Sequence, residues 1–149
     1  MKKLLGILVL GLLWCNVGFA NNDLTGVKLL CKETPKFKSW DIPFRTYEFI
    51  NDHEYLYYRL NRYDLTISSS KGFYKADLRN IYVYTDQLEY HKESRDQFII
   101  QRDTLYFIFK NIDSTFATCT VQKKNEDLKK RLEDELEFMK SKILEKNKI

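Results

Sequence analysis

The sequence predicts an all-β fold, a small antiparallel meander closed as a barrel, followed by a C-terminal amphipathic α-helix. Three observations support this prediction. Between residues 25 and 122, apolar and polar side chains alternate with a period of two, as in half-buried strands. Two cysteines, Cys31 and Cys119, lie in the first and the last of these alternating segments. After residue 125 the apolar residues recur with the period of a helix.

The N-terminus has the layout of a cleaved secretory signal. Two lysines precede an apolar run of eleven residues at 4–14, and small residues stand at the last and third-last positions before Asn21. The run is about half of the roughly 20 residues that a membrane-spanning helix needs. We therefore predict a signal peptide at 1–20, cleavage after Ala20, and a periplasmic protein that does not span the membrane.

Cys15, just behind the apolar run, raises the alternative of a lipid-anchored protein in which this cysteine is the first mature residue. Lipoprotein signals place a small residue immediately before the cysteine, whereas the bulky Trp14 stands there in this chain. We therefore expect Cys15 to be removed together with the signal.

The length of the chain predicts a single domain, and its basic and acidic residues nearly balance. Removal of the first 20 of 149 residues leaves 129, a length that can bury one core. Residues 21–122 carry 14 basic and 14 acidic side chains, and residues 123–149 carry nine and seven. Because no basic stripe concentrates the charge, we predict no nucleic-acid partner.

The mature chain keeps an even number of cysteines, two, in a protein directed to an oxidising compartment. A disulfide between Cys31 and Cys119 is the default interpretation, with free buried thiols as the alternative. A metal or redox pair is disfavoured because the two lie 88 positions apart, with no CxxC and no clustered histidines. Bridged Cα atoms lie within about 7 Å, so the first strand would lie beside or across from the last. This favours a barrel over the alternative, a β-sandwich.

Nine short segments rich in Tyr, Phe, Ile and Thr carry the strand pattern. In order they are "TGVKLLCKE", "RTYEFIN", "EYLYYRL", "YDLTIS", "NIYVYTD", "QLEYHK", "DQFIIQR", "DTLYFIFK" and "TFATCTVQ". Turn residues stand between several of them, at 50–54, 68–72, 76–80 and 110–114. Eight or nine consecutive strands joined by short turns predict an antiparallel meander.

The pattern of residues 123–149 predicts one amphipathic helix. Asn125 is the expected N-cap, and acidic residues follow it in the first turn, where the helix dipole favours them. We predict that the helix packs on the barrel, with pairing to another chain as the alternative. The apolar stripe consists of Leu128, Leu132, Leu136, Met139 and Ile143.

The sequence contains no recognisable catalytic motif. His53 is expected in a turn and His91 at a polar strand end, and neither accompanies a nucleophile signature. P-loop, Rossmann, HExxH and EF-hand patterns are absent from the sequence. Residues 52–54 point in different directions on extended chain and do not converge on a metal. We predict a non-enzymatic protein without metal or cofactor.

The aromatic content is the remaining functional signal, with ten Tyr and ten Phe. In a small barrel such residues fill the interior or line a ligand cavity. We predict that the protein holds a small apolar or aromatic ligand. The alternative is a protein-interaction or inhibitor factor of the cell envelope, acting through its surface and C-terminal helix. The candidate ligand-binding residues are Tyr47, Tyr57, Tyr82, Tyr84, Tyr90 and Tyr106.

Together with the signal, four segments carry a loose resemblance: "LLCKE" at 29–33, "YEFIN" at 47–51, "IIQRDTL" at 99–105 and "CTV" at 119–121. In this layout the chain resembles small exported proteins of lysine-rich bacterial proteomes. The resemblance implies a lipocalin-like or similar small barrel and brings no known activity.

Overall fold

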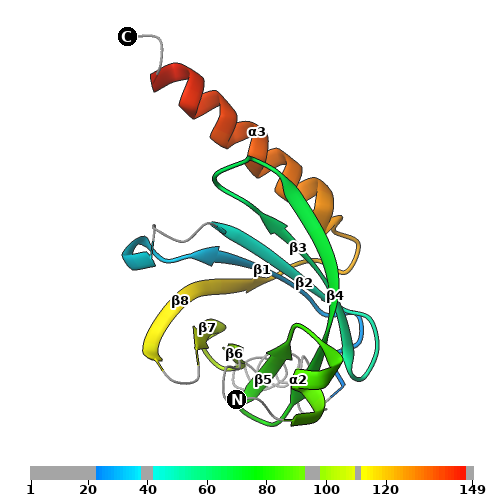
Figure 1. Cartoon of the computed structure of the whole chain (residues 1–149). Coiled ribbons are helices and arrows are strands. Elements are labelled where there is room, and N and C mark those ends of the chain that lie inside the picture. The colour runs from blue at the N-terminus through cyan, green and yellow to red at the C-terminus, as the bar shows by residue number, and fades with distance from the viewer. Residues whose placement is uncertain (1–22, 38–41, 93–97, 110–111, 147–149) are drawn as a thin grey trace, which may run out of the picture.

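The computed structural model describes residues 23–37, 42–92, 98–109 and 112–146, which form a closed eight-stranded barrel and a long C-terminal helix (Figure 1). Each strand pairs antiparallel with the next, and the last strand pairs with the first. The predicted antiparallel barrel is therefore confirmed, and the β-sandwich does not form. The expected signal peptide at 1–20 lies outside the described residues.

The strands follow one another around the barrel in chain order. They are β1 (Lys28–Glu33), β2 (Phe44–Phe49), β3 (Glu54–Leu60), β4 (Ile67–Ala76), β5 (Asn80–Tyr84), β6 (Phe98–Gln101), β7 (Tyr106–Phe109) and β8 (Ile112–Val121). The helical elements are a 3-10 turn η1 (Pro35–Phe37), the short helix α2 (Gln87–Lys92) between β5 and β6, and the terminal helix α3 (Leu128–Lys146).

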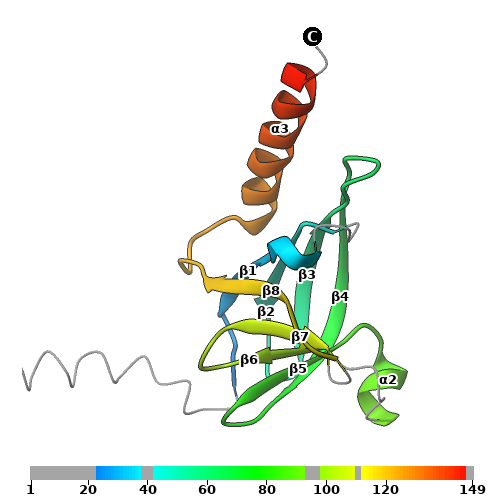
Figure 2. The ribbon, with the colours of Figure 1, turned by 90° about the vertical axis from the view of Figure 1, so that its left-hand side faces the viewer.

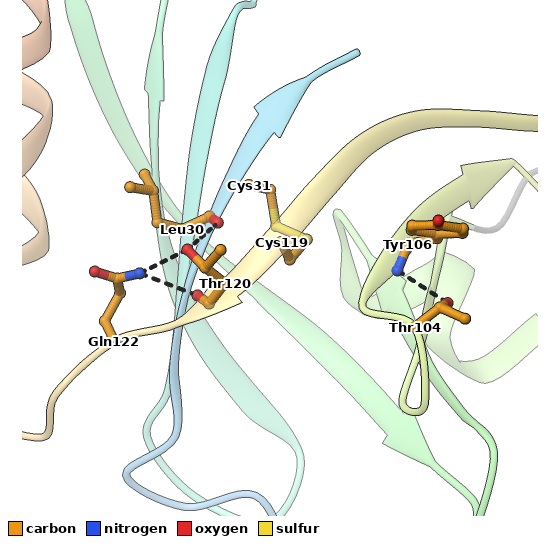
Figure 3. The surroundings of a disulfide bond; sticks show 7 residues. All are labelled: Leu30, Cys31, Thr104, Tyr106, Cys119, Thr120 and Gln122. Carbon is orange, nitrogen blue, oxygen red and sulfur yellow. Dashed lines mark hydrogen bonds between the residues drawn. A yellow bond between two sulfur atoms is a disulfide. The ribbon is translucent and has the colours of Figure 1, made fainter.

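The seam between β1 and β8 closes the barrel. Cys31 lies directly opposite Cys119 in the antiparallel ladder, and the two form a disulfide with Cα atoms 3.9 Å apart (Figure 3). On the outer face, the Thr120 hydroxyl donates to the Leu30 carbonyl at 3.3 Å, and the Gln122 amide donates to the Thr120 hydroxyl at 2.8 Å. The predicted disulfide is confirmed, and it places the first strand beside the last.

Apolar side chains seal the end of the barrel at which β1 begins and β2 finishes, called the closed end here. Leu24, Phe49 and Tyr74 are buried there, and the rings of Phe49 and Tyr74 meet edge to face with centroids 4.7 Å apart. The Tyr74 hydroxyl accepts a hydrogen bond from the Leu24 backbone N–H at 3.3 Å and donates to the Asn51 carbonyl at 2.7 Å. The chain preceding β1 thus plugs this end.

Gly72 allows the Tyr55 ring to lie across β4. The two residues are partners in the β3–β4 ladder. A Cβ atom at position 72 would lie 2.4 Å from the Cζ and Oη atoms of Tyr55 and 2.6 Å from the Tyr84 carbonyl oxygen. The Tyr55 hydroxyl donates to that same carbonyl at 3.0 Å, so the ring bridges from β3 over β4 to β5. A residue without a side chain is therefore required at this position.

The turn predicted at 68–72 is wrong, because these residues lie inside β4 and all pair with β3. The chain turns at 61–66 instead, so the predicted strand "YDLTIS" is largely a turn. Two side-chain oxygens stabilise this turn: Asn61 accepts from the Tyr63 backbone N–H at 2.9 Å, and Asp64 accepts from the Thr66 N–H at 3.1 Å.

"QLEYHK" was expected as a strand and forms helix α2 instead, which places His91 on a helix. Its Tyr90 ring packs against Phe73 and Tyr84, with centroids 5.7 and 5.5 Å away. The segment therefore covers the outer face of β4 and β5 and adds no strand to the sheet. As a helix, it satisfies its backbone hydrogen bonds within itself.

Helix α3 begins two residues later than predicted and packs on the barrel by its first turns. The Asp127 carboxylate, rather than Asn125, caps the helix, accepting from the backbone N–H groups of Lys129 and Lys130 at 3.0 and 3.1 Å. Leu132 is fully buried against a cluster of outward-facing side chains from β1 to β3. The C-terminal half of α3 extends away from the barrel (Figures 1 and 2). The covered cluster consists of Leu30, Phe44 and Leu60.

Replacement of Leu132 by Ala should lower the free energy of unfolding by about 2–5 kcal/mol, because it leaves a cavity between α3 and the barrel wall. Leu144→Ala is the matched control on the same helix, where the side chain is 64% exposed. It should change stability by less than about 0.5 kcal/mol. Urea unfolding measures both; equal effects would contradict the packing described.

Replacement of Gly72 by Ala should destabilise the protein by about 1–3 kcal/mol, because the new methyl group displaces the Tyr55 ring. The cost should shrink when Tyr55→Leu is already present, since the ring is then gone. A double-mutant cycle by thermal unfolding measures the coupling, and strict additivity would count against a ring lying across Gly72.

Candidate functional site

The end of the barrel opposite the plug, at which β1 finishes and β2 begins, is called the open end. Strand alternation places Tyr47 and Tyr57 inside the barrel as direct partners across β2 and β3. The next inward pair toward the open end is Arg45 and Arg59, also direct partners in the ladder. Two arginines thus stand where an apolar interior meets its opening.

A cavity of about 150 Å³ occupies the open end. It receives side chains from β2, β3, β5 and β6, so the meander brings together residues that are far apart in sequence. Its lining residues are Ile42, Arg45, Tyr47, Tyr55, Tyr57, Arg59, Val83, Thr85 and Phe98.

Aromatic rings in mutual contact form the floor of this cavity. Tyr47 stacks with Tyr57 and meets Tyr55 edge to face, with centroid separations of 6.3 and 5.3 Å. Phe98 stacks on Phe107 at 5.1 Å. Because each ring contacts at least one other, the floor is held in place before any ligand arrives.

The two arginines lie against these rings. The Arg45 guanidinium carbon is 5.5 Å from the Phe98 ring centre and 5.3 Å from that of Phe107. The Arg59 guanidinium carbon is 5.6 Å from the Tyr57 ring centre, and its Nε donates to the Ser68 hydroxyl at 3.3 Å. Cation–π contacts of this kind attract a guanidinium to the negative face of a ring and fix its plane.

The charged residues among the described lining of the cavity are Arg45 and Arg59. No Asp or Glu is among its described lining residues. The adjoining small pocket is lined by both Arg45 and Glu33, and Glu33 forms an ion pair with Arg62. Burial raises the pKa of the Tyr47 phenol, and the opposing attraction of Arg45 offsets only part of this. The Tyr47 hydroxyl is therefore protonated at neutral pH.

The structure brings only part of the predicted tyrosine set together at the open end. Tyr47 and Tyr57 line the cavity. Tyr84 and Tyr90 meet outside the barrel wall, with ring centroids 5.5 Å apart. Tyr82 also points outward and donates its hydroxyl to Asp77 at 3.0 Å.

The remaining candidate, Tyr106, is 42% exposed on the outer face of β7 (Figure 3). The residues missed by the sequence reasoning are Tyr55, Phe98, Arg45 and Arg59. The arginines had a readable signal, because in "RTY" and "YYR" each shares a strand face with an inward tyrosine.

Other chemistry is limited in the part of the chain that the structure describes. No group of three or more His, Cys, Asp or Glu side chains there has the arrangement of a metal site. His53 lies in the exposed turn at the closed end, with its Nδ1 atom 2.5 Å from Asp52. Within the same ranges, neither helix has the length and apolar character needed to cross a membrane.

Comparison with protein-family models, with curated proteins and with solved structures finds no match. Function is therefore inferred from the structure and the sequence of this chain.

Stability should fall as the pH rises above about 10, because unfolded tyrosines ionise near pH 10.0 while Tyr47 in the folded state keeps its proton. The unfolded state then binds fewer protons, so the free energy of unfolding decreases with pH. Tyr47→Phe should show a shallower decline than wild type between about pH 9 and pH 11. Urea midpoints measure this, with the exposed Tyr106→Phe as control; parallel curves for Tyr47→Phe and wild type would contradict it.

Proposed function

We propose that the protein is an exported, non-enzymatic binding protein that holds a small aromatic or apolar ligand at the open end of its barrel. One observation carries the proposal: the interior is sealed at one end by Leu24 and its neighbours, yet leaves a cavity of about 150 Å³ between aromatic rings at the other. Concave apolar sites with a few polar groups are the usual small-molecule sites of proteins.

The size of the cavity supports a ligand with a single ring. An engineered protein cavity of about 150 Å³ lined by apolar side chains holds one benzene molecule. A long acyl chain or a fused ring system would need more room than the described lining provides. The stacked floor of Tyr47, Tyr57 and Phe98 offers flat faces that match such a ring.

The composition of the lining supports binding over catalysis. Its described residues include no His, Cys, Asp, Glu or Lys, the groups that most often transfer protons or attack substrates. The tyrosine and threonine hydroxyls and the arginines supply hydrogen bonds for orientation.

Two observations support an exported, periplasmic protein. Disulfides persist in oxidising compartments and are rare in the cytosol, and the Cys31–Cys119 bond joins the first strand to the last. The N-terminal twenty residues have the composition of a cleaved signal.

Tyr57→Leu should weaken binding of benzyl alcohol, because it removes one ring of the floor. Tyr58→Leu, the neighbouring residue on the same strand, is the matched control, since Tyr58 packs outside the barrel against the α3 cluster. Amide chemical shifts titrated with benzyl alcohol give both affinities. We expect Tyr57→Leu to lose about tenfold, near 1.4 kcal/mol, and Tyr58→Leu to bind as wild type does. Equal affinities would argue against a ligand at the open end.

The second candidate function is a protein-interaction factor, favoured by the distal part of α3, where Phe138, Ile143 and Leu144 are 54, 44 and 64% exposed. Deleting residues 125–149 is a poor test, because it also removes Leu132 and uncovers the barrel wall. A sharper variant is Ile143→Ser with Leu144→Ser, which leaves the packed turns intact. If this variant no longer binds an identified envelope protein, while Tyr57→Leu still binds it, the second function is favoured.

A further inference from the structure

The β3–β4 hairpin rises past the strands that follow it (Figures 1 and 2). All seven residues of β3 pair with β4, whereas β5 pairs with β4 only from Phe73 to Ala76. Within the described ranges, no strand pairs with residues 67–72 on the side of β4 that faces away from β3. We call this side of residues 67–72 the β4 edge. Its exposed residues are Ser68, Ser69, Ser70 and Lys71.

Hydrogen bonds to β3 determine which backbone groups the β4 edge presents. The Tyr74 N–H donates to the His53 carbonyl at 2.7 Å. At the other end of β4, the Asn61 N–H donates to the Thr66 carbonyl at 2.9 Å. Successive residues of an antiparallel strand direct their N–H and C=O groups alternately to one neighbour and to the other, so the even-numbered residues of β4 bond to β3. The residues that direct both groups away from β3 at the edge are Ile67, Ser69 and Lys71.

The β4 edge is already in place for another strand. Helix α3 packs on the outer face of β2 and β3 and holds the hairpin from that side, where Ile67 contacts the buried cluster of Leu60 and Leu132. The edge itself is not covered by this helix. A strand edge with outward N–H and C=O groups is a template for pairing with a further strand, and the main-chain hydrogen bonds then provide the affinity.

The same strand of a second copy fits this edge. In an antiparallel pair centred on Ser69, that residue lies opposite itself, and Ile67 lies opposite Lys71 of the second copy. The N–H and C=O groups of all three outward-directed residues then find partners in one register. Like charges do not face each other in it, because each Lys71 lies opposite an isoleucine. The paired segment ends before Phe73, where β5 continues the sheet.

Helix α3 offers a second copy a further surface. In an antiparallel pair of hairpins, the tip of each hairpin points toward the barrel of the other copy. The distal part of α3 extends past the hairpin tip in both views (Figures 1 and 2). Its Phe138, Ile143 and Leu144 side chains are exposed. The second copy therefore stands at the end of the molecule that carries these apolar side chains.

From this arrangement we propose that the protein forms a two-fold symmetric dimer in which the β4 strands of two copies pair antiparallel, centred on Ser69. Both copies use the same surface, as in other interfaces with two-fold symmetry. The dimer goes beyond the proposed ligand binding and does not depend on it.

Amide hydrogen exchange of the purified exported protein tests the pairing within one strand. Because a one-strand interface is small, we expect dimers at about 1 mM protein and monomers at about 5 µM. The N–H groups of Ile67, Ser69 and Lys71 should exchange at least about threefold more slowly in the concentrated sample. Those of Ser68 and Ser70 bond to β3 in both states and are the internal control. A change with concentration that does not distinguish the two sets, or no change at all, overturns the pairing.

A proline at position 69 tests the same hydrogen bonds by sedimentation velocity. Ser69→Pro removes an N–H that faces away from β3, so the monomer tolerates it as edge strands tolerate proline. It should raise the dissociation constant of the dimer about tenfold or more. Ser69→Ala keeps the N–H and is the matched control, expected within about twofold of wild type. Thermal unfolding checks that both variants are folded. A wild-type protein that stays monomeric at about 1 mM, or a folded Ser69→Pro that dimerises as wild type does, overturns the proposal.

Opposite charges at position 69 test the symmetry and do not depend on the proline variant. A residue on the two-fold axis meets its own copy, so Ser69→Lys and Ser69→Asp should each weaken self-association about threefold or more. An equimolar mixture of the two variants should form a mixed dimer that is tighter than either variant alone. If the mixture shows no such gain, or if neither variant changes the dissociation constant, the copies do not pair through β4 and the proposal is overturned.

Discussion

The pairing of β1 with β8 is the constraint on which the rest of the molecule depends. A meander of eight strands that stays open has two edges whose backbone groups need partners. Here the first and last strands pair along five residue positions, and the Cys31–Cys119 disulfide ties them in the middle. Closure gives every strand an inner face, and the side chains on these faces must fill one enclosed volume. The aromatic richness of the sequence serves this need.

The interior is filled differently at the two ends of the barrel. At the closed end, Leu24 and Tyr74 continue the apolar interior, and backbone hydrogen bonds from Gly26 and Val27 hold the chain preceding β1 in place. At the open end the inner positions of β2 and β3 change from tyrosine to arginine. The same alternation that builds the core thus places two arginines beside its aromatic rings at the opening.

The barrel and its seam could be predicted from the sequence, whereas the inner face of β5, the course of β4 and the position of the cavity could not. The period of two and the cysteine pair are local and countable features, so they predict the barrel and its seam. The inner face of β5 is not readable in this way, because "NIYVY" is apolar on both faces; Ile81 and Val83 point inward, while Tyr82 and Tyr84 face out. The "SSSKG" stretch favours a turn by composition, but its pairing with the tyrosine-rich β3 makes it a strand. The position of the cavity depends on which end Leu24 plugs, a long-range contact without a local signal.

The central claim is that ligand binding occurs at the open end, between the arginine pair and the aromatic floor. Isotope-filtered NOE spectra of labelled protein with unlabelled benzyl alcohol test it most directly. We predict contacts from the ring protons of benzyl alcohol to the side chains of Tyr57 and Phe98. Contacts to Phe138 and Leu144 on the distal part of α3, with none inside the barrel, would contradict it.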